Sequence, residues 1–243
     1  MFPKWLCDET ADLVQTVRQN GSLGWDPNTV VIKDVCSRCN TGVLSQLDAF
    51  AKSVWEEPLS RIVQADDGPI DYEIDVQKFF RWLLKVSYNM ARAKGASSDV
   101  AALADTVPLM LGEDSCLRTT ALYHGTLVPV TRAAKRYEPR GVRIAIAGGG
   151  GPFATMRLVG LRSHLFLVAI STRPDPDIDD WEFPPFIPAL GLQFDRIDLS
   201  GRCLPVRPSG VDVLRFEEIM TENDREAYQR ALVREDSRAR RGK

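Results

Sequence analysis

Two cysteines three positions apart are the residues of this chain whose types and spacing best suit chemistry. Cys36 and Cys39 are separated by Ser37 and Arg38, and Asn40 follows them. Two thiolates on one tight turn can share a tetrahedral Zn²⁺ at about 2.3 Å each, but a closed zinc site needs four ligands. The sequence contains no second CxxC and no CxxH. The spacing therefore leaves three hypotheses: a zinc site, two reduced thiols, or a redox pair, which would require a thioredoxin-like βαβ setting.

The two histidines of the chain are the other candidate group. His124 and His164 each fall in a segment with the pattern of a strand, and no Ser, Cys or carboxylate pattern of a catalytic triad lies near either one. We expect each to be an ordinary strand histidine, either exposed or satisfied in the core. An unrelated enzyme with its site in the β-rich part of the chain stays open as an alternative, and it predicts a pocket lined by His124 or His164.

Length and composition set the class of protein. The chain has 243 residues, of which 44% are hydrophobic and 26% charged, which is typical of a globular protein and excludes a disordered or fibrous one. The formal charge of -2 gives no overall attraction to phosphate backbones, so a nucleic-acid contact would have to come from a local patch. Five cysteines without regular spacing, no signal peptide and no long apolar run indicate a cytoplasmic protein without a membrane segment.

The elements that position the thiol pair follow from the spacing of apolar residues around it. Residues 9–19 predict a short helix. A strand over Thr29–Lys33 leads to the CxxC, and apolar residues at helical spacing predict a helix over residues 41–56 that Pro58 ends. The predicted local order is therefore strand, CxxC, helix.

Farther along the chain, the pattern changes from helices to strands. The alternating run Ile70–Ile74 predicts a strand, and Asp75 is placed to cap a long helix with apolar residues from Val76 to Met90. A second helix is expected to start near Ser98 and to end before Pro108. Five short β-branched or alternating runs then predict an antiparallel sheet, namely Ala121–Val130, Val142–Ala147, Ala154–Leu161, His164–Ser171 and Leu192–Leu199. A polar helix over residues 217–233 completes the predicted elements.

Motifs in the first quarter of the chain resemble a subgroup of bacterial HNH endonucleases. The segment Phe2-Pro3-Lys4-Trp5-Leu6, the run from Val35 to Gly42 around the CxxC, and a helix that carries Leu47-Asp48 match the pattern of that subgroup. There, a sequence of the form Glu-His-(Val/Ile)-Phe-Pro-Lys-Trp-Leu precedes a Val-Cys-x-x-Cys-Asn-x-Gly knuckle, and an upstream CxxC completes the zinc site.

The resemblance implies a ββα-metal module, of the HNH or treble-clef-like kind, that hydrolyses DNA. In such a module zinc is structural, a divalent cation such as Mg²⁺ or Mn²⁺ offsets the charge that develops at the scissile phosphate, and the family's His activates water. The resemblance assigns Cys36 and Cys39 to the zinc and gives Asn40 a supporting role in the catalytic site. DNA is the implied partner.

This chain departs from the family at its start. The family's His and upstream CxxC would precede Phe2, where the sequence has only Met1. With half a zinc site and no general base, we expect DNA cleavage by the family's mechanism to be impaired or absent in the chain as given. One hypothesis is a true start farther upstream, with a GTG valine codon taken for the start codon. The competing one is a shortened, non-catalytic binding or scaffold protein of bacterial defence or DNA metabolism.

Together these observations predict an α+β protein. Residues 1–57 are expected to form an incomplete HNH-like ββα module. Residues 58–243 are expected to form an α+β domain of unassigned function, with helices to about residue 111, strands over residues 121–199 and a C-terminal helix over residues 217–233. The predicted cofactors are Zn²⁺ and, for cleavage, Mg²⁺ or Mn²⁺.

Overall fold

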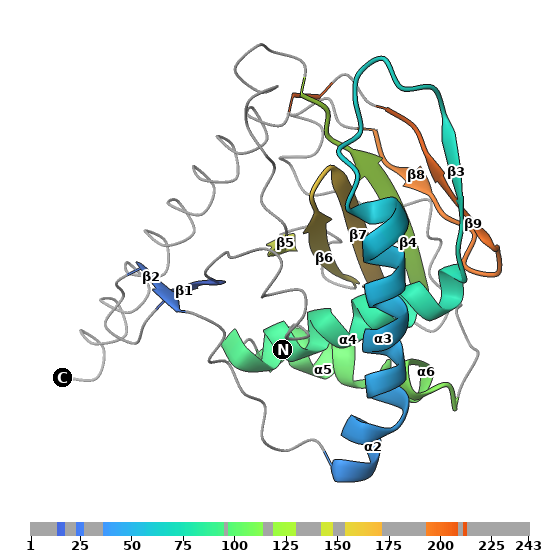
Figure 1. The fold of residues 1–243 in the computed structure, drawn as a ribbon. Helices are drawn as coiled ribbons and strands as arrows, with labels where there is room; N and C mark the ends of the chain where they lie inside the picture. Colours follow the sequence, from blue (N-terminus) through green and yellow to red (C-terminus); the bar gives the residue numbers. More distant parts are fainter. Residues whose placement is uncertain are drawn as a thin grey trace.

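The chain folds as an α+β protein in a computed structural model that describes residues 14–17, 23–26, 36–94, 97–113, 119–129, 142–147, 154–171, 193–208 and 211–212. A five-stranded antiparallel sheet lies at its centre and helices cover one face of that sheet (Figure 1). The described residues also form two separate two-stranded antiparallel sheets. The α+β class predicted from the sequence is confirmed.

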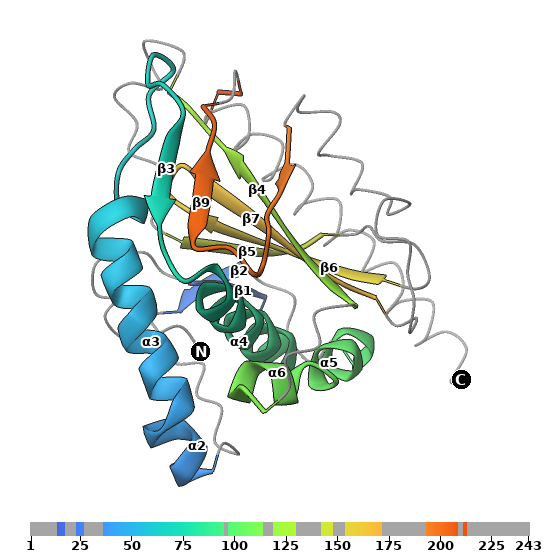
Figure 2. The same cartoon turned by 90° about the vertical axis from the view of Figure 1, so that its right-hand side faces the viewer.

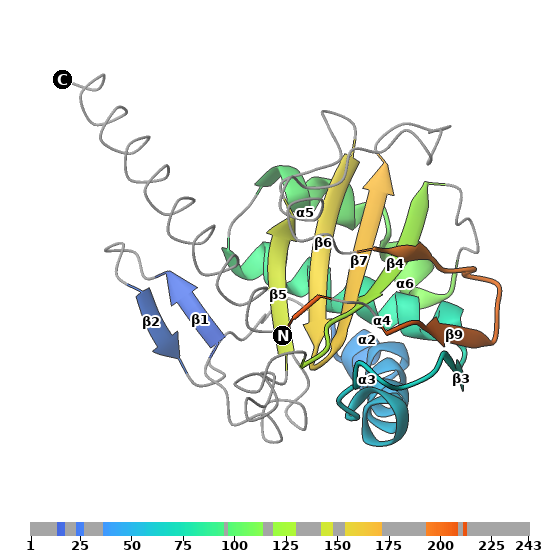
Figure 3. The same cartoon turned by 90° about the horizontal axis from the view of Figure 1, so that it is seen from above.

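The five-stranded sheet has the strand order β5-β6-β7-β4-β8 (Figure 3), and all its pairings are antiparallel. Its strands are β4 (Thr120–Thr126), β5 (Val142–Ala147), β6 (Ala154–Leu161), β7 (His164–Ser171) and β8 (Asp195–Arg196). A two-residue turn joins β6 to β7, and Arg162 in that turn has a φ of 50°, the left-handed conformation that tight hairpin turns need. Strands β5, β6 and β7 have the bounds predicted from their β-branched or alternating sequences.

Helices from the first half of the chain lie against one face of the sheet (Figure 2). They are α2 (Ser37–Thr41), α3 (Val43–Val54), the π-helical turn η1 (Trp55–Leu59), α4 (Val76–Lys94), α5 (Ser97–Ala104) and α6 (Val107–Leu111). The long helix α4 is central, since it contacts α3, α5, α6 and β6. Asp75 caps it as predicted, because its Oδ1 accepts the backbone N–H of Lys78 at 2.8 Å.

One hydrophobic core lies between these helices and the sheet. Phe79 and Trp82 of α4 stack with their ring centroids 5.8 Å apart, and Phe79 meets Phe166 of β7 edge-on at 5.0 Å. The first helices join the same core through Leu47, Ala51, Val54, Trp55 and Leu59. Among the described residues the core therefore continues across position 57, and the division into units of residues 1–57 and 58–243 stays a prediction.

The two-stranded ribbon pairs β3 (Ile70–Glu73) with β9 (Cys203–Val206) in antiparallel register. We call it the β3–β9 ribbon. Strand β9 lies against β4 (Figure 2) and buries every second side chain, Leu204 and Val206. The sequence predicted β3 but not β9, because a four-residue run that contains Pro205 carries a weak strand pattern.

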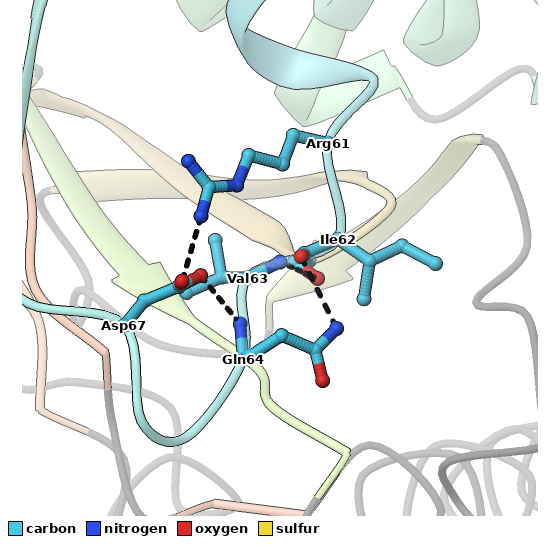
Figure 4. Close-up of polar contacts among 6 residues, drawn as sticks. Arg61, Ile62, Val63, Gln64 and Asp67 are labelled. Atoms are coloured by element: carbon cyan, nitrogen blue, oxygen red, sulfur yellow. Dashed lines mark hydrogen bonds and ion pairs between the residues drawn. The ribbon is translucent and has the colours of Figure 1, made fainter.

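The loop between η1 and β3 is held by its own side chains (Figure 4). Arg61 Nη2 lies 2.6 Å from Asp67 Oδ1, and the other Asp67 oxygen accepts the backbone N–H of Gln64 at 2.8 Å. The backbone N–H of Val63 donates to Ser163 Oγ at 3.1 Å. Because Ser163 lies in the turn between β6 and β7, this bond attaches the loop that precedes β3 to the sheet.

Two predictions about the first part of the chain are wrong. The helix predicted over residues 9–19 is contradicted in its described part, because Val14–Val17 is strand β1, which pairs in antiparallel register with β2 (Leu23–Asp26). The β-branched residues of Val-Gln-Thr-Val favour a strand, and this preference outweighs the helical spacing. Pro58 does not end its helix either. The backbone instead widens into the π-helical turn η1, in which the backbone N–H of Ser60 donates to the Trp55 carbonyl at 2.9 Å. This wider turn accommodates Pro58, which has no backbone N–H.

Other boundaries differ by less. Strand β4 starts one residue before the predicted Ala121 and ends at Thr126, and β8 covers only two residues of the predicted run Leu192–Leu199. Strand β9 extends the β-rich part beyond residue 199. The predicted strand over Thr29–Lys33 and the predicted helix over residues 217–233 lie outside the described residues.

Candidate functional site

The predicted thiol pair lies at the start of α2. Cys36 immediately precedes this helix, and its Sγ accepts the backbone N–H of Cys39 at 3.2 Å. Asn40 belongs to the same turn, and its backbone N–H donates to the Cys36 carbonyl at 3.0 Å. One helical turn therefore brings together the three residues that the sequence proposed for the site, namely the two thiols as zinc ligands and Asn40 in a supporting role.

Gly42 makes the junction between α2 and α3. Its backbone N–H donates to the Arg38 carbonyl at 3.0 Å, and a Cβ at this position would lie only 2.7 Å from that oxygen. Any other residue would push the two helices apart or break this bond. This close approach is a physical reason why the knuckle pattern has a glycine two positions after its asparagine, which is Gly42 in this chain.

The two thiols are accessible and differ in acidity. Cys36 and Asn40 are exposed, and Cys39 is half-buried. Hydrogen bonds from the side chain and backbone of Cys39 lower the pKa of the Cys36 thiol. The same side-chain hydrogen bond, with some burial, raises the pKa of Cys39. The geometry therefore favours a Cys36 thiolate that accepts a hydrogen bond from the Cys39 thiol, and a metal would have to displace that second proton.

The thiol pair supplies half of a zinc site. Among the residues that the structure describes, no group of three or more His, Cys, Asp or Glu side chains is placed to hold a metal ion. Cys203 is exposed in β9, and Cys7 and Cys116 lie outside the described residues. Two thiols fit the donor chemistry of zinc, and two further ligands are needed to close the tetrahedron.

Asp48 fastens the helix that follows the thiol pair to the rest of the molecule. Its Oδ2 lies 2.5 Å from Nζ of Lys85, and its Oδ1 accepts the indole N–H of Trp82 at 3.2 Å. Lys85 is buried and also donates to the Leu44 carbonyl at 3.3 Å. These contacts join α3 to α4, so the short helix α2 that carries the thiol pair is followed directly by a helix that is anchored in the core.

The structure brings the two histidines together, which the sequence did not predict. His124 of β4 and His164 of β7 are 2% and 0% exposed, and His124 Nε2 lies 3.2 Å from His164 Nδ1. The two strands are neighbours in the sheet although β5 and β6 come between them in the sequence. Both histidines are thus buried in the core and in contact with each other, and Nε2 of His164 has no hydrogen-bond partner among the described residues.

Comparison with known proteins adds no identification. No family model, no curated protein and no solved structure matches this chain. Within the described part of the chain, no helix combines the length and the apolar character that crossing a membrane requires. A function has to be inferred from the residues and their geometry.

Proposed function

We propose that this chain is related to HNH endonucleases and takes part in metal-dependent hydrolysis of DNA. Cys36 and Cys39 would supply half of a structural zinc site, and Asn40 would orient or support the catalytic centre beside it. The placement of two accessible thiols and Asn40 on one helical turn is the observation that carries the proposal. The chain order of antiparallel hairpin β1–β2 followed by helices α2 and α3 agrees with a ββα arrangement.

The thiol pair is built to hold its shape. Cys36 Sγ is fixed by the N–H of Cys39, and Gly42 allows α3 to continue directly from α2. The ion pair between Asp48 and Lys85 then connects α3 to the core. A zinc ion held by such a turn would fix the segment that supplies the other two ligands, and metal binding of this kind contributes folding free energy directly.

Residues 36–40 do not supply a general base for phosphodiester hydrolysis. The attacking water needs a proton acceptor near the phosphate and a cation to offset the developing charge. The two histidines of the chain are both buried in the core, 2% and 0% exposed, so neither is available to a DNA substrate. The proposal therefore requires a base from a segment that precedes the Phe-Pro-Lys-Trp-Leu motif, as in the family that the chain resembles.

Zinc content tests the structural half of the proposal. The gene region upstream would be cloned in frame, and zinc would be measured in the purified chain with and without that extension. We expect about one zinc ion per extended chain, lost in Cys36→Ser and in Cys39→Ser. Cys203→Ser is the matched control, since Cys203 is exposed and lies in β9, and it should retain the metal. Zinc that survives in both Cys36→Ser and Cys39→Ser would show that these thiols are not ligands.

Nicking of supercoiled plasmid DNA tests the catalytic half. The extended chain should nick DNA with Mg²⁺ or Mn²⁺ and stop when EDTA is added. Asn40→Ala should lower the rate by about 10–100-fold, the usual effect of losing a group that orients a metal site, while zinc content stays unchanged. An extended chain that holds zinc but never nicks DNA would overturn the catalytic proposal and favour a non-catalytic binding protein.

A further inference from the structure

The buried histidine pair lies where the β3–β9 ribbon meets the five-stranded sheet. The rings of His124 and His164 stack with centroids 5.4 Å apart and an angle of 26° between their planes. Tyr72 of β3 presents its ring edge-on to His164 at 6.2 Å, and the side chain of His124 donates a hydrogen bond to the Pro205 carbonyl of β9. Each strand of the ribbon therefore contacts one member of the pair.

The hydrogen bonds determine where the protons of the pair lie. A carbonyl oxygen only accepts, so the N–H of neutral His124 is used on Pro205. The Nε2 of His124 is then an acceptor, and His164 Nδ1 must donate to it across 3.2 Å. This leaves a lone pair on Nε2 of His164, which is buried and has no hydrogen-bond partner among the described residues. The pair thus holds one proton on each ring and has one vacant basic nitrogen.

No ladder of backbone hydrogen bonds joins the described strands of the β3–β9 ribbon to the five-stranded sheet, so side-chain hydrogen bonds contribute to its attachment. Strand β3 pairs with β9, and the two form a sheet of their own. The attachments on β4 are His124, bonded to the Pro205 carbonyl, and Thr126, whose Oγ1 donates to the Arg207 carbonyl. Of these two bonds, only the one from His124 involves a group that can titrate.

Within the described part of the chain, a further proton on the pair would meet no buried counter-charge. The ionisable groups on the elements packed around it are Asp71, Tyr72 and Glu73 on β3, Tyr123 on β4, Arg157 on β6, Asp195 and Arg196 on β8, Cys203 on β9 and Arg162 in the β6–β7 turn. Asp71, Glu73 and Arg196 are exposed. Asp195 is opposite His124 in the strand register but exposed, and Cys203 is exposed as well. Arg157 is buried on the same face of the sheet as the pair and would oppose a second positive charge. The neighbour from α4 is apolar, since Phe79 reaches Phe166 beside the histidines.

We propose that His124 and His164 form an acid-sensitive latch that releases the β3–β9 ribbon from the sheet when the pair takes up a proton. An imidazolium in this position can regain solvation only if the ribbon moves away. Burial agrees with this, because it lowers the pKa of His124 to about 3 and, together with the charge of His124, lowers the pKa of His164 well below 6.5. The latch is independent of the function proposed above for residues 36–40.

Nuclear magnetic resonance on the unmodified chain tests the latch directly. Two histidines give two imidazole signals, and neither should titrate near pH 6.5 while the ribbon is closed. Below that pH, the opening equilibrium measured by amide exchange in β3 and β9, corrected for intrinsic rates, should rise about tenfold per pH unit for each proton taken up. The amides of β6 and β7 should stay protected. An imidazole that titrates near pH 6.5 with the ribbon still closed, or equal opening of β6 and β7, would overturn the proposal.

Variants separate the latch from a general loosening of the ribbon. The double variant His124→Asn/His164→Leu has no group that titrates at this place, and its ribbon opening should lose the dependence on pH between 6.5 and 4. Thr126→Val is the matched control, because it removes a ribbon attachment that cannot titrate. It should raise opening by the same factor at every pH and keep the slope. A double variant that folds and keeps the acid dependence of the unmodified chain would contradict the latch.

Discussion

Asp48 shows how much one polar side chain can contribute to this fold. It is 27% exposed in its side chain, whereas its partner Lys85 is only 10% exposed, and a distance of 2.5 Å joins the two charged groups. Asp48→Ala would leave the ammonium group of Lys85 without its counter-charge in the interior. We expect a loss of about 2–4 kcal/mol in the free energy of unfolding, which urea denaturation would measure.

The surface pair of Lys52 and Glu56 is the matched control for this change. It spans one helical turn at 3.4 Å, and both side chains are about half exposed. Because water already solvates these charges, Glu56→Ala should cost no more than about 0.5 kcal/mol. Equal losses in the free energy of unfolding for Asp48→Ala and Glu56→Ala would show that the buried ion pair stabilises the fold no more than the exposed one does. The double variant Asp48→Leu/Lys85→Met should recover much of the stability, since no charge is then left buried.

At the scale of single elements, α4 depends on its first turn. Asp75 satisfies the N–H of Lys78, one of the donors that a helix leaves unpaired at its start. Asp75→Ala should lower the free energy of unfolding by about 0.5–2 kcal/mol, and Asp75→Asn should restore most of it. Asp66→Ala, at an exposed turn position, serves as the control. A null effect of Asp75→Ala in thermal and urea unfolding would mean that packing alone specifies where α4 begins.

Elements with a strong local pattern were predictable, and those that depend on a partner were not. Strands β5, β6 and β7 have the predicted bounds because β-branched residues and alternation recur over six to eight positions. Strand β9 is only four residues long and becomes a strand by pairing with β3. The same holds for β8, which pairs with β4 over two residues. Short segments of this kind take their structure from tertiary contacts.

At the scale of the whole molecule, the first helices and the sheet share one core. Leu47, Ala51, Val54 and Trp55 are buried together with residues of α4, β6 and β7. A large apolar side chain contributes about 1.5–3 kcal/mol when buried, against a total stability of about 5–15 kcal/mol for a domain. A fragment of residues 58–243 should therefore lack a cooperative thermal transition, and a fragment of residues 36–243 should show one. A sharp calorimetric transition in the shorter fragment would instead support separate units.

The buried histidines make the stability of the whole molecule sensitive to acid. Each has a folded-state pKa below the ordinary 6.5, mainly because burial disfavours the charged ring. Between 6.5 and the folded-state values, the unfolded chain binds more protons, so stability is fully present above pH 6.5 and is lost as the pH falls. The expected slope is about 1.4 kcal/mol per pH unit for each histidine. Urea unfolding at several pH values would measure this dependence of the free energy of unfolding on pH. If the slope were unchanged in His124→Asn/His164→Leu, the acid sensitivity would come from other groups.

The sequence by itself determined the elements whose signals are local. Asp75 as a helix cap, the β-branched or alternating strands β5 to β7, and the CxxC with Asn40 at the start of a helix all follow from residues within a few positions of one another. Only the tertiary structure decided that His124 and His164 form a pair, that Asp48 meets Lys85, and that the core continues across position 57. The physical reason is that local spacing sets the face on which a side chain lies, whereas its partner depends on which distant segment packs against that face.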